Sequence, residues 1–322
     1  MDNNERPLLR KTWFGRCIFV GWYCERGSCK FCYRSTTSHK KKHAVKSRRS
    51  MSSMIADAVI GKNLGWKFEY LTGGYANWDI DRIVEIAKNI SEVYGEKIWV
   101  NLGVLSEDEM DKLNPYVEGI CASMETVEKE LHDKICPDKP MEPYFEMLDL
   151  AKKKGFKTSI TIVIGLGEKK ENISLLFDFI KEHKLDRITF YALKPVKGTE
   201  FEGKESPSVE DYSWWIRKVR EEFPSIEIIA GLTPKKVDYV KYILEAGATA
   251  ITKFPAVRLF GSEKAQKIEK MAKEANREFV GSLTKVPSHI DWDEEVDKLS
   301  INSDLKEKVK VKLEQYLTKI KQ

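Results

Sequence analysis

The chain has 322 residues, of which 42% are hydrophobic and 11% aromatic, enough for a sizeable core in one large domain or two medium ones. This composition excludes a largely disordered chain and a small disulfide-stapled protein. The net charge of +5 is weak for this length and does not by itself indicate nucleic-acid binding. No apolar run approaches the roughly 20 residues that cross a bilayer, and the polar start is not a secretory signal. We therefore expect a cytoplasmic protein without membrane contact.

Short apolar runs alternate with amphipathic stretches along most of the chain, which predicts βαβ units and a parallel sheet. Strands are predicted at Arg16–Tyr23, Phe68–Leu71, Ile98–Gly103, Gly119–Met124, Thr158–Ile164, Arg187–Leu193, Ile226–Ala230 and Thr249–Phe254. Helices are predicted at Ser50–Trp66, Ile80–Val93, after Ser106, at Val127–Asp133, Pro143–Lys154, Glu171–Glu182, Val209–Glu222, Lys235–Ala246, Glu263–Asn276 and Leu305–Lys321.

Eight such units over about 280 residues fit an α/β fold, a closed (β/α)8 barrel of the TIM type. A six-unit open barrel with extra C-terminal elements is the alternative. We predict that residues 1–285 form the barrel and that residues 286–322 form a C-terminal helical extension with an exposed helix. In such barrels the chemistry sits at the C-terminal ends of the strands, so the residues that follow each strand are the informative ones.

The strongest chemical signal is a cysteine cluster that follows the first predicted strand. Cys24, Cys29 and Cys32 lie in the sequence C-ERGS-C-KF-C. In a cytosolic chain such clustering favours a metal site over disulfides. Three thiolates on one loop can hold three irons of a [4Fe–4S] cluster and leave the fourth iron open to a small molecule.

Three further cysteines lie outside this loop. Cys17 falls inside the first predicted strand, where it is either a small core residue or the fourth ligand of a closed zinc or iron–sulfur site. Cys121 and Cys136 are interpreted as packing or surface thiols.

The three-cysteine loop, with Phe31 before its last cysteine, resembles that of radical S-adenosylmethionine (SAM) enzymes. The resemblance runs from about Arg16 to Thr284. It is to the full-barrel branch that includes biotin synthase, methylornithine synthase and the [FeFe]-hydrogenase radical SAM maturase. That family usually has three residues between the first two cysteines, whereas this sequence has four. Because its cysteines are spaced more widely than the family norm, this sequence is most similar to one branch of the family. That branch is the radical SAM protein that takes part in the biosynthesis of the iron-guanylylpyridinol cofactor of [Fe]-hydrogenase.

The resemblance implies SAM contacts on successive strand ends. Thr72-Gly73-Gly74 resembles the motif that receives the methionine amino group, and the motif at Ser123 and Glu125 resembles the one whose carboxylate binds the ribose hydroxyls. Segments after the fifth and sixth strands would border adenosine. The implied cofactor-binding residues are Tyr33, Thr72, Gly73, Gly74, Ser123, Glu125, Ile164, Gly165, Lys197 and Gly198.

Two departures from the family pattern concern the SAM site. Tyr75 stands where an acidic residue often follows the glycine motif. The arginine that pairs with the methionine carboxylate in relatives is missing, because its position falls at about Tyr144. Arg34 and the basic segment around it are the candidate replacements.

A third departure excludes the biotin synthase reaction. Sulfur insertion requires a second cluster held by cysteines inside the barrel, and the matching positions are Leu71, Trp99 and Ser159. Thiolates are needed to hold such a cluster, so we expect no auxiliary cluster of that kind.

The resemblance implies an enzyme that uses a [4Fe–4S] cluster and SAM to generate a 5′-deoxyadenosyl radical. This radical would take a hydrogen atom from a small organic substrate inside the barrel, and an electron donor such as ferredoxin or flavodoxin would reduce the cluster. The candidate reaction is formation of the pyridinol precursor, and a methylornithine-synthase-like or [FeFe]-hydrogenase-maturase-like reaction is the alternative. The candidate substrate contacts are Asn101, Thr161, Tyr191 and Arg258.

A basic segment without acidic residues runs from Arg34 to Arg49. It is interpreted as an electropositive flap over the cluster that attracts an anionic substrate, or as a solvated loop. A zinc-stabilised RNA-binding or scaffold protein is the alternative of another class. Aromatic residues are sparse in this segment, so nucleic acid is not the expected partner.

Overall fold

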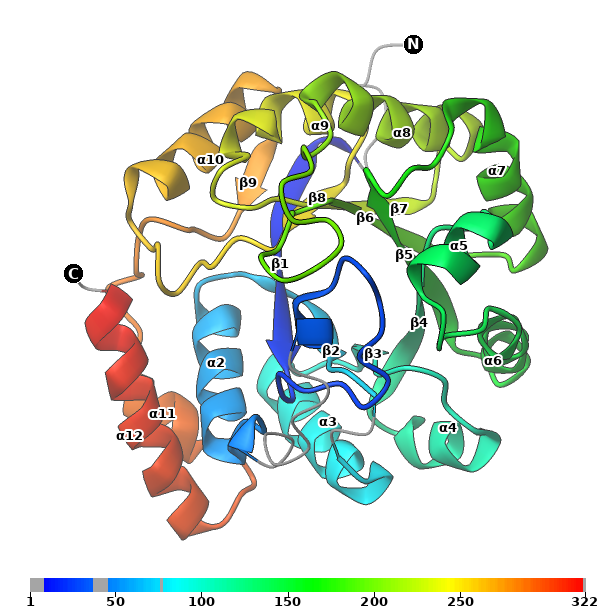
Figure 1. Ribbon diagram of the computed structural model, residues 1–322. Coiled ribbons are helices and arrows are strands. Elements are labelled where there is room, and N and C mark those ends of the chain that lie inside the picture. The colour runs from blue at the N-terminus through cyan, green and yellow to red at the C-terminus, as the bar shows by residue number, and fades with distance from the viewer. Residues whose placement is uncertain (1–8, 37–45, 76–77, 321–322) are drawn as a thin grey trace.

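Eight parallel strands form a closed barrel, with helices around its outside (Figure 1). The computed structural model describes residues 9–36, 46–75 and 78–320. The strand order is β2-β3-β4-β5-β6-β7-β8-β1, and β1 pairs again with β2 to close the ring. The predicted TIM-type barrel is confirmed, and the open alternative is wrong. The strands are β1 (Lys11–Phe19), β2 (Lys67–Thr72), β3 (Ile98–Asn101), β4 (Val117–Glu125), β5 (Lys157–Ile164), β6 (Arg187–Ala192), β7 (Glu227–Gly231) and β8 (Ala250–Thr252).

Helices alternate with the strands, and polar side chains cap several of their N-termini. The helix predicted after Ser106 begins with a capping box, in which Ser106 and Glu109 bond each other's backbone N–H groups. The helices are α2 (Met51–Asn63), α3 (Ile80–Tyr94), α4 (Glu107–Leu113), α5 (Lys129–Ile135), α6 (Glu142–Lys153), α7 (Ile173–Glu182), α8 (Val209–Glu222), α9 (Val240–Glu245), α10 (Glu263–Glu274), α11 (Trp292–Asp297) and α12 (Ser303–Ile320).

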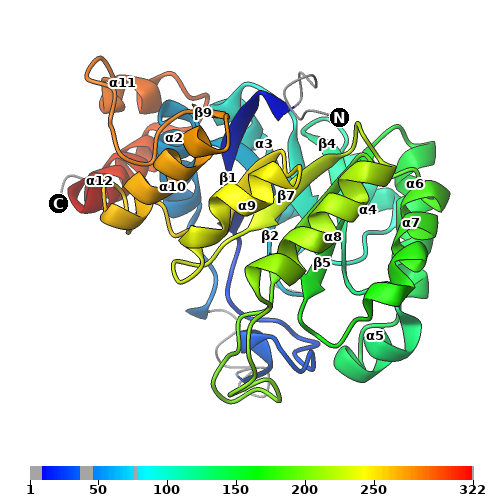
Figure 2. The same ribbon diagram turned by 90° about the horizontal axis from the view of Figure 1, so that it is seen from above.

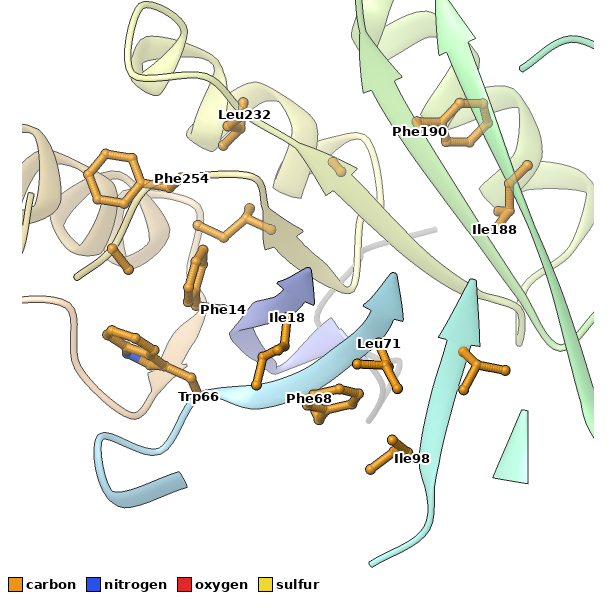
Figure 3. Close-up of a cluster of buried hydrophobic side chains, with 14 of the residues drawn as sticks. Phe14, Ile18, Trp66, Phe68, Leu71, Ile98, Ile188, Phe190, Leu232 and Phe254 are labelled. Carbon is orange, nitrogen blue, oxygen red and sulfur yellow. The ribbon is translucent and has the colours of Figure 1, made fainter. Parts of the chain in front are cut away.

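The main core lies between the strands and the surrounding helices. Figure 3 shows part of this layer, where Ile18 and Leu71 on neighbouring strands lie close to Phe68. Because side chains alternate along a strand, the neighbours of these core residues point the other way, into the barrel. Cys17 and Tyr70 are such interior residues, and their partners are other side chains inside the barrel.

Several predicted boundaries differ from the structure, and three of these differences have a clear structural reason. The first strand begins at Lys11 instead of Arg16, because its first residues pair with a ninth short strand, β9 (Glu278–Val280), that the sequence did not predict. The last barrel strand ends at Thr252, because Lys253 has a left-handed backbone with φ of 66°. The helix expected from Lys235 begins with a 3-10 turn, and α9 follows at Val240.

The C-terminal helix α12 packs against α2, so the prediction that it is exposed is wrong. Its charged residues dominate the composition, but its apolar residues recur at helical spacing and form one buried stripe. The buried side chains are Val309, Leu313, Leu317 and Ile320. The division of the chain at residue 285 stays a prediction. Among the described helices, none is both long and apolar enough to cross a membrane.

The packing of α12 predicts a specific stability effect. Leu313 is 1% exposed, whereas Val311 on the same helix is 55% exposed. We expect Leu313→Ala to lower the free energy of unfolding by about 2–5 kcal/mol, because the cavity it leaves removes contacts with the barrel. Urea unfolding of the purified protein measures this. Val311→Ala is the matched control, with an expected change within about 0.5 kcal/mol. Equal effects of the two substitutions would contradict the packing.

Candidate active site

A cavity of about 580 Å³ opens at the C-terminal end of the barrel strands. The loop that follows β1 and the loop between β6 and α8 lie at this same end (Figures 1 and 2). The cavity therefore lies where a (β/α)8 barrel carries its chemistry. The predicted site residues on its wall are Cys29, Cys32, Tyr33, Thr72, Gly73, Asn101, Ser123, Glu125, Thr161, Tyr191 and Arg258.

The loop with the three cysteines is tied to the barrel by backbone hydrogen bonds. The Lys30 N–H donates to the carbonyl of Ile135 at the end of α5 (2.9 Å), and the Lys30 carbonyl accepts from the N–H of Glu200 (3.1 Å). At the other end of the loop, the Tyr75 N–H donates to the sulfur of Cys24 (3.4 Å). The loop is thus held between α5, the β6–α8 loop and the segment after β2.

The cysteines of this loop suit an iron–sulfur cluster better than a single metal ion. A structural zinc needs its ligands at about 2.0–2.3 Å from one point. In residues 9–36, 46–75 and 78–320, no three Cys, His, Asp or Glu side chains are arranged to hold one ion. Cys24, Cys29 and Cys32 are all partly exposed, and thiolates are the ligands that iron–sulfur clusters use. The donor set is therefore of the kind that iron–sulfur clusters use.

Cys17 does not belong to this loop. It lies on β1 inside the barrel, where its thiol donates to Glu69 at 2.9 Å. Burial contributes most to raising the pKa of the Cys17 thiol, and the nearby Glu69 raises it further. The Cys17 thiol is thus part of the hydrogen-bonded network inside the barrel and is not on the cysteine loop. The closed four-cysteine alternative is therefore not supported by the geometry.

Cys136 lies next to a predicted cluster ligand, which the sequence gave no reason to expect. It is buried just after α5, and its thiol is hydrogen-bonded to Cys29. This hydrogen bond contributes most to lowering the pKa of Cys29, and it contributes most to raising the pKa of Cys136. The other remaining cysteine, Cys121, is buried inside the barrel, and burial raises its pKa to about 12. Neither is a surface thiol.

The glycine motif after β2 divides into two parts. Thr72 and Gly73 line the cavity. Gly74 instead packs beneath the cysteine loop, where an added Cβ atom would lie 2.5 Å from the Cβ of Cys24. A side chain at this position would push Cys24 away, so the glycine is required for the loop to approach the barrel.

A buried ion pair lies beside the cysteine loop. Lys139 is 5% exposed, and its ammonium donates to the carboxylate of Glu125 at 2.8 Å. Its charge also lies above the ring of Tyr144, 5.4 Å from the centroid, and Tyr144 in turn shares a 2.5 Å hydrogen bond with Tyr75. Lys139 therefore brings a positive charge beside Tyr144, the residue at which the resemblance predicts a missing arginine. Nothing in the sequence singled out this lysine.

Arg34, the cation expected from the sequence, is placed differently. Its guanidinium lies over the rings of Tyr33 and Phe19, at 5.1 Å and 5.7 Å from their centroids. It does line the cavity. Most of the predicted basic flap, residues 37–45, lies outside the described residues.

The expected adenosine contacts lie off the cavity wall. The carboxylate of Glu168 accepts from the N–H groups of Gly165, Leu166 and Gly167, which occupies these donors. The Ile164 carbonyl accepts from Leu193. Lys197 and Gly198 are exposed, and it is the neighbouring Val196 that reaches the cavity. The roles of these four predicted residues stay predictions.

The floor of the cavity is a buried polar network around Glu69. This carboxyl group is completely buried on β2 and accepts from Cys17 and from Tyr191 (3.4 Å), and Thr252 is a third partner. Sequence reasoning missed Glu69, although an acidic residue in the apolar run of a central strand was a usable signal. Burial is the first cause that raises its pKa above the ordinary value of 4.5.

The buried Glu69 predicts a pH dependence of stability. Because its pKa is raised in the folded state, the folded protein holds this proton more tightly than the unfolded chain. The resulting stability is present at a pH below 4.5 and is lost as the pH rises through the raised pKa. We expect the stability advantage of Glu69→Gln over the wild type to grow with pH across this window, as measured by urea unfolding. The exposed Glu182→Gln is the control and should parallel the wild type. A constant difference for Glu69→Gln would contradict the raised pKa.

Comparisons with known proteins show which proteins this chain is similar to. A family model described as the Radical SAM superfamily matches residues 20–180. An uncharacterized protein of Methanocaldococcus jannaschii is 37% identical, across 95% of this chain and 89% of that protein. Biotin synthase of Clostridium botulinum is 25% identical, across 83% of this chain and 86% of the relative. The crystal structure of methylornithine synthase has a TM-score of 0.65 at 23% identity, covering 76% of this chain and 72% of that one, a likeness of fold alone.

Proposed function

This chain belongs to the radical SAM superfamily, and we propose that Cys24, Cys29 and Cys32 hold its [4Fe–4S] cluster over the barrel cavity. The chain is an enzyme, and the cofactors of its family are this cluster and SAM. Together they supply a 5′-deoxyadenosyl radical that can take a hydrogen atom from an unactivated carbon. The observation that carries the proposal is the position of the three-cysteine loop at the mouth of the cavity, with Cys29 and Cys32 on the cavity wall.

The residues on the β2 to β4 side would bind SAM. Thr72 and Gly73 line the cavity wall after β2, and Ser123 and Glu125 follow on β4. The side chain of Ser123 donates to Asn101 at 2.7 Å, which fixes both groups. We assign the missing methionine-carboxylate partner to Lys139, because a buried ammonium attracts a second carboxylate strongly where water is excluded.

The adenosine and substrate contacts are proposed around the same cavity. Apolar side chains of Val163, Leu193 and Phe31 cluster next to Cys29 and would exclude water from the reacting groups. Ile164, Gly165, Lys197 and Gly198 would lie at the outer edge of adenosine, and Tyr33 at the rim. Asn101, Thr161, Tyr191 and Arg258 line the cavity and would contact the substrate.

The finer proposal is that the product is the pyridinol precursor of the iron-guanylylpyridinol cofactor of [Fe]-hydrogenase. The four-residue spacing between Cys24 and Cys29 favours this branch. A reduced ferredoxin or flavodoxin would supply the electron. A methylornithine-synthase-like or [FeFe]-hydrogenase-maturase-like reaction is the second candidate, and the fold likeness to methylornithine synthase does not select between them. Isotope tracing from labelled precursors into a pyridinol ring, or into a rearranged amino acid, decides between the two.

The cluster assignment predicts which thiol is essential. We expect Cys29→Ala, reconstituted without oxygen, to lose the iron–sulfur absorption and the release of 5′-deoxyadenosine from SAM after reduction. Cys17→Ala should retain both, because Cys17 bonds to Glu69 inside the barrel. Iron analysis, absorption spectra and chromatography of the nucleoside measure these effects. Cluster formation and SAM cleavage without Cys29 would refute the assignment, and so would a colourless wild-type protein that holds only zinc.

The ion pair between Glu125 and Lys139 predicts that protein stability and SAM affinity respond differently to substitution. We expect Glu125→Gln to lower the free energy of unfolding by about 3–5 kcal/mol, because it leaves the buried Lys139 without its partner. The double variant Glu125→Gln/Lys139→Met should regain most of this stability. It should still bind SAM about tenfold or more weakly than the wild type, because both proposed contacts are lost. Calorimetric titration of SAM into the reconstituted protein measures the affinity. Wild-type affinity in the double variant would contradict both assignments.

A further inference from the structure

Two cations follow the last barrel strand on the wall that faces β4. Lys253 comes directly after β8, and Arg258 lies five residues later. Both line the cavity described above, and both also line an adjoining cavity of about 800 Å³ between the barrel and α12. In the closed eight-stranded order, β8 lies opposite β4. The two cations are therefore across the cavity from Glu125.

The backbone at Lys253 is held in an uncommon conformation. Its φ of 66° lies in the left-handed region, which costs free energy for a residue with a Cβ atom. This left-handed residue also marks the end of the pairing between β8 and β1. That pairing consists of Phe14 with Ile251 and Gly15 with Thr252. Some residues that line both cavities come directly after the point where the pairing of β8 with β1 ends. Strained residues of this kind are concentrated at functional sites.

The surroundings direct the side chain of Lys253 toward the cavity. Gly231 on the neighbouring strand leaves room for it, since an added Cβ atom there would lie 3.3 Å from the Cγ of Lys253. The same missing side chain makes room for the ring of Tyr191. The ammonium of Lys253 lies 4.5 Å from the centroid of Tyr191 and 5.3 Å from that of Phe19. The cation is thus held between two aromatic rings of the cavity wall.

The positive charges on this wall are not neutralised by acidic side chains. Within the described ranges, neither Lys253 nor Arg258 forms an ion pair, whereas the nearby acids are engaged elsewhere. Glu125 is paired with Lys139, and Asp57 is paired with two arginines, Arg16 and Arg49. The positive charge of Lys253 also acts on Glu69, but this carboxyl group is buried in the floor of the cavity and is hydrogen-bonded there.

We propose that Lys253 and Arg258 bind the carboxylate of the substrate, a small organic acid whose body lies against the aromatic side chains of Phe19, Trp22 and Tyr191. This inference rests on the proposed function, because it names the substrate class of the same cavity. One ammonium and one guanidinium can bond both oxygens of a carboxylate, and the planar guanidinium matches its geometry. The remainder of the substrate would then extend from β8 toward the cysteine loop.

The test is calorimetric titration of the reconstituted protein, saturated with SAM, with benzoate, benzamide and inorganic phosphate. Benzamide has the shape of benzoate without its charge. We expect benzoate to bind about tenfold or more tightly than benzamide, because only the carboxylate forms charge-assisted hydrogen bonds. Lys253→Asn should weaken benzoate binding by about tenfold or more. Asparagine tolerates the left-handed backbone, so this substitution removes the charge without adding strain.

Arg258→Gln is the second variant, at an exposed side chain with no structural partner in the described residues, and it should weaken benzoate binding to a similar extent. Lys194→Gln is the matched control, because Lys194 lines the same cavity from the β6 side and carries the same charge. Its benzoate affinity should stay within about threefold of the wild type. The proposal is overturned if the wild type does not bind benzoate, if both variants bind it as the wild type does, or if phosphate binds more tightly than benzoate.

The two proposals fail in different ways. A wild type that binds benzoate through Lys253 and Arg258 but releases no 5′-deoxyadenosine from SAM would refute the proposed function and support the anion subsite. A wild type that cleaves SAM, with benzoate affinity unchanged in both variants, would refute the subsite alone.

Discussion

The arrangement of the site depends on how closely the three-cysteine loop approaches the open end of the barrel. Lys30 in the middle of this loop is bonded through its N–H to α5 and through its carbonyl to the β6–α8 loop. At the start of the loop, Cys24 rests on Gly74, where no side chain larger than hydrogen fits. These anchors belong to different βα units, so the loop takes this position only when the barrel is closed. Folding and assembly of the proposed cluster site are therefore linked, as is usual for sites whose ligands need a preformed scaffold.

Charge is distributed unevenly around the cavity. On the β4 side, the positive charge of Lys139 is buried and is matched by Glu125. On the β8 side, Lys253 and Arg258 are open to the cavity and have no acidic partner in the described residues. A buried pair is strongly coupled and gives a fixed geometry, whereas exposed cations can exchange water for an incoming anion. The two walls therefore differ in kind, because one holds a matched charge pair and the other carries cations that an anion can reach.

The barrel and the main site segments could be predicted from the sequence because they depend on local patterns. Period-two and period-3.6 hydrophobicity places the strands and helices, and the family motifs follow strand ends in order. The residues that were missed depend on contacts between distant segments. Cys136 lies beside Cys29 only because α5 lies against the cysteine loop in the folded barrel. Lys139 reaches Glu125 because the chain turns back after α5 toward the end of β4. The apolar stripe of α12 recurs at helical spacing in the sequence. The helix was nevertheless predicted to be exposed, because lysine and glutamate dominate its composition.

The barrel interior explains why this fold would support a different reaction from that of biotin synthase. Two of the positions where that enzyme needs cysteines lie inside the barrel here, and they are Trp99 and Ser159. The third, Leu71, packs outward in the main core, and Tyr70 takes the interior place. The hydroxyl of Tyr70 bonds Ser159 at 2.9 Å and Thr189 at 3.1 Å, which closes the interior below the cavity. The open part of the cavity is therefore the space above this network, between the cysteine loop and the cations after β8, because the bulky side chains below it leave no room for a ligand to reach deeper into the barrel.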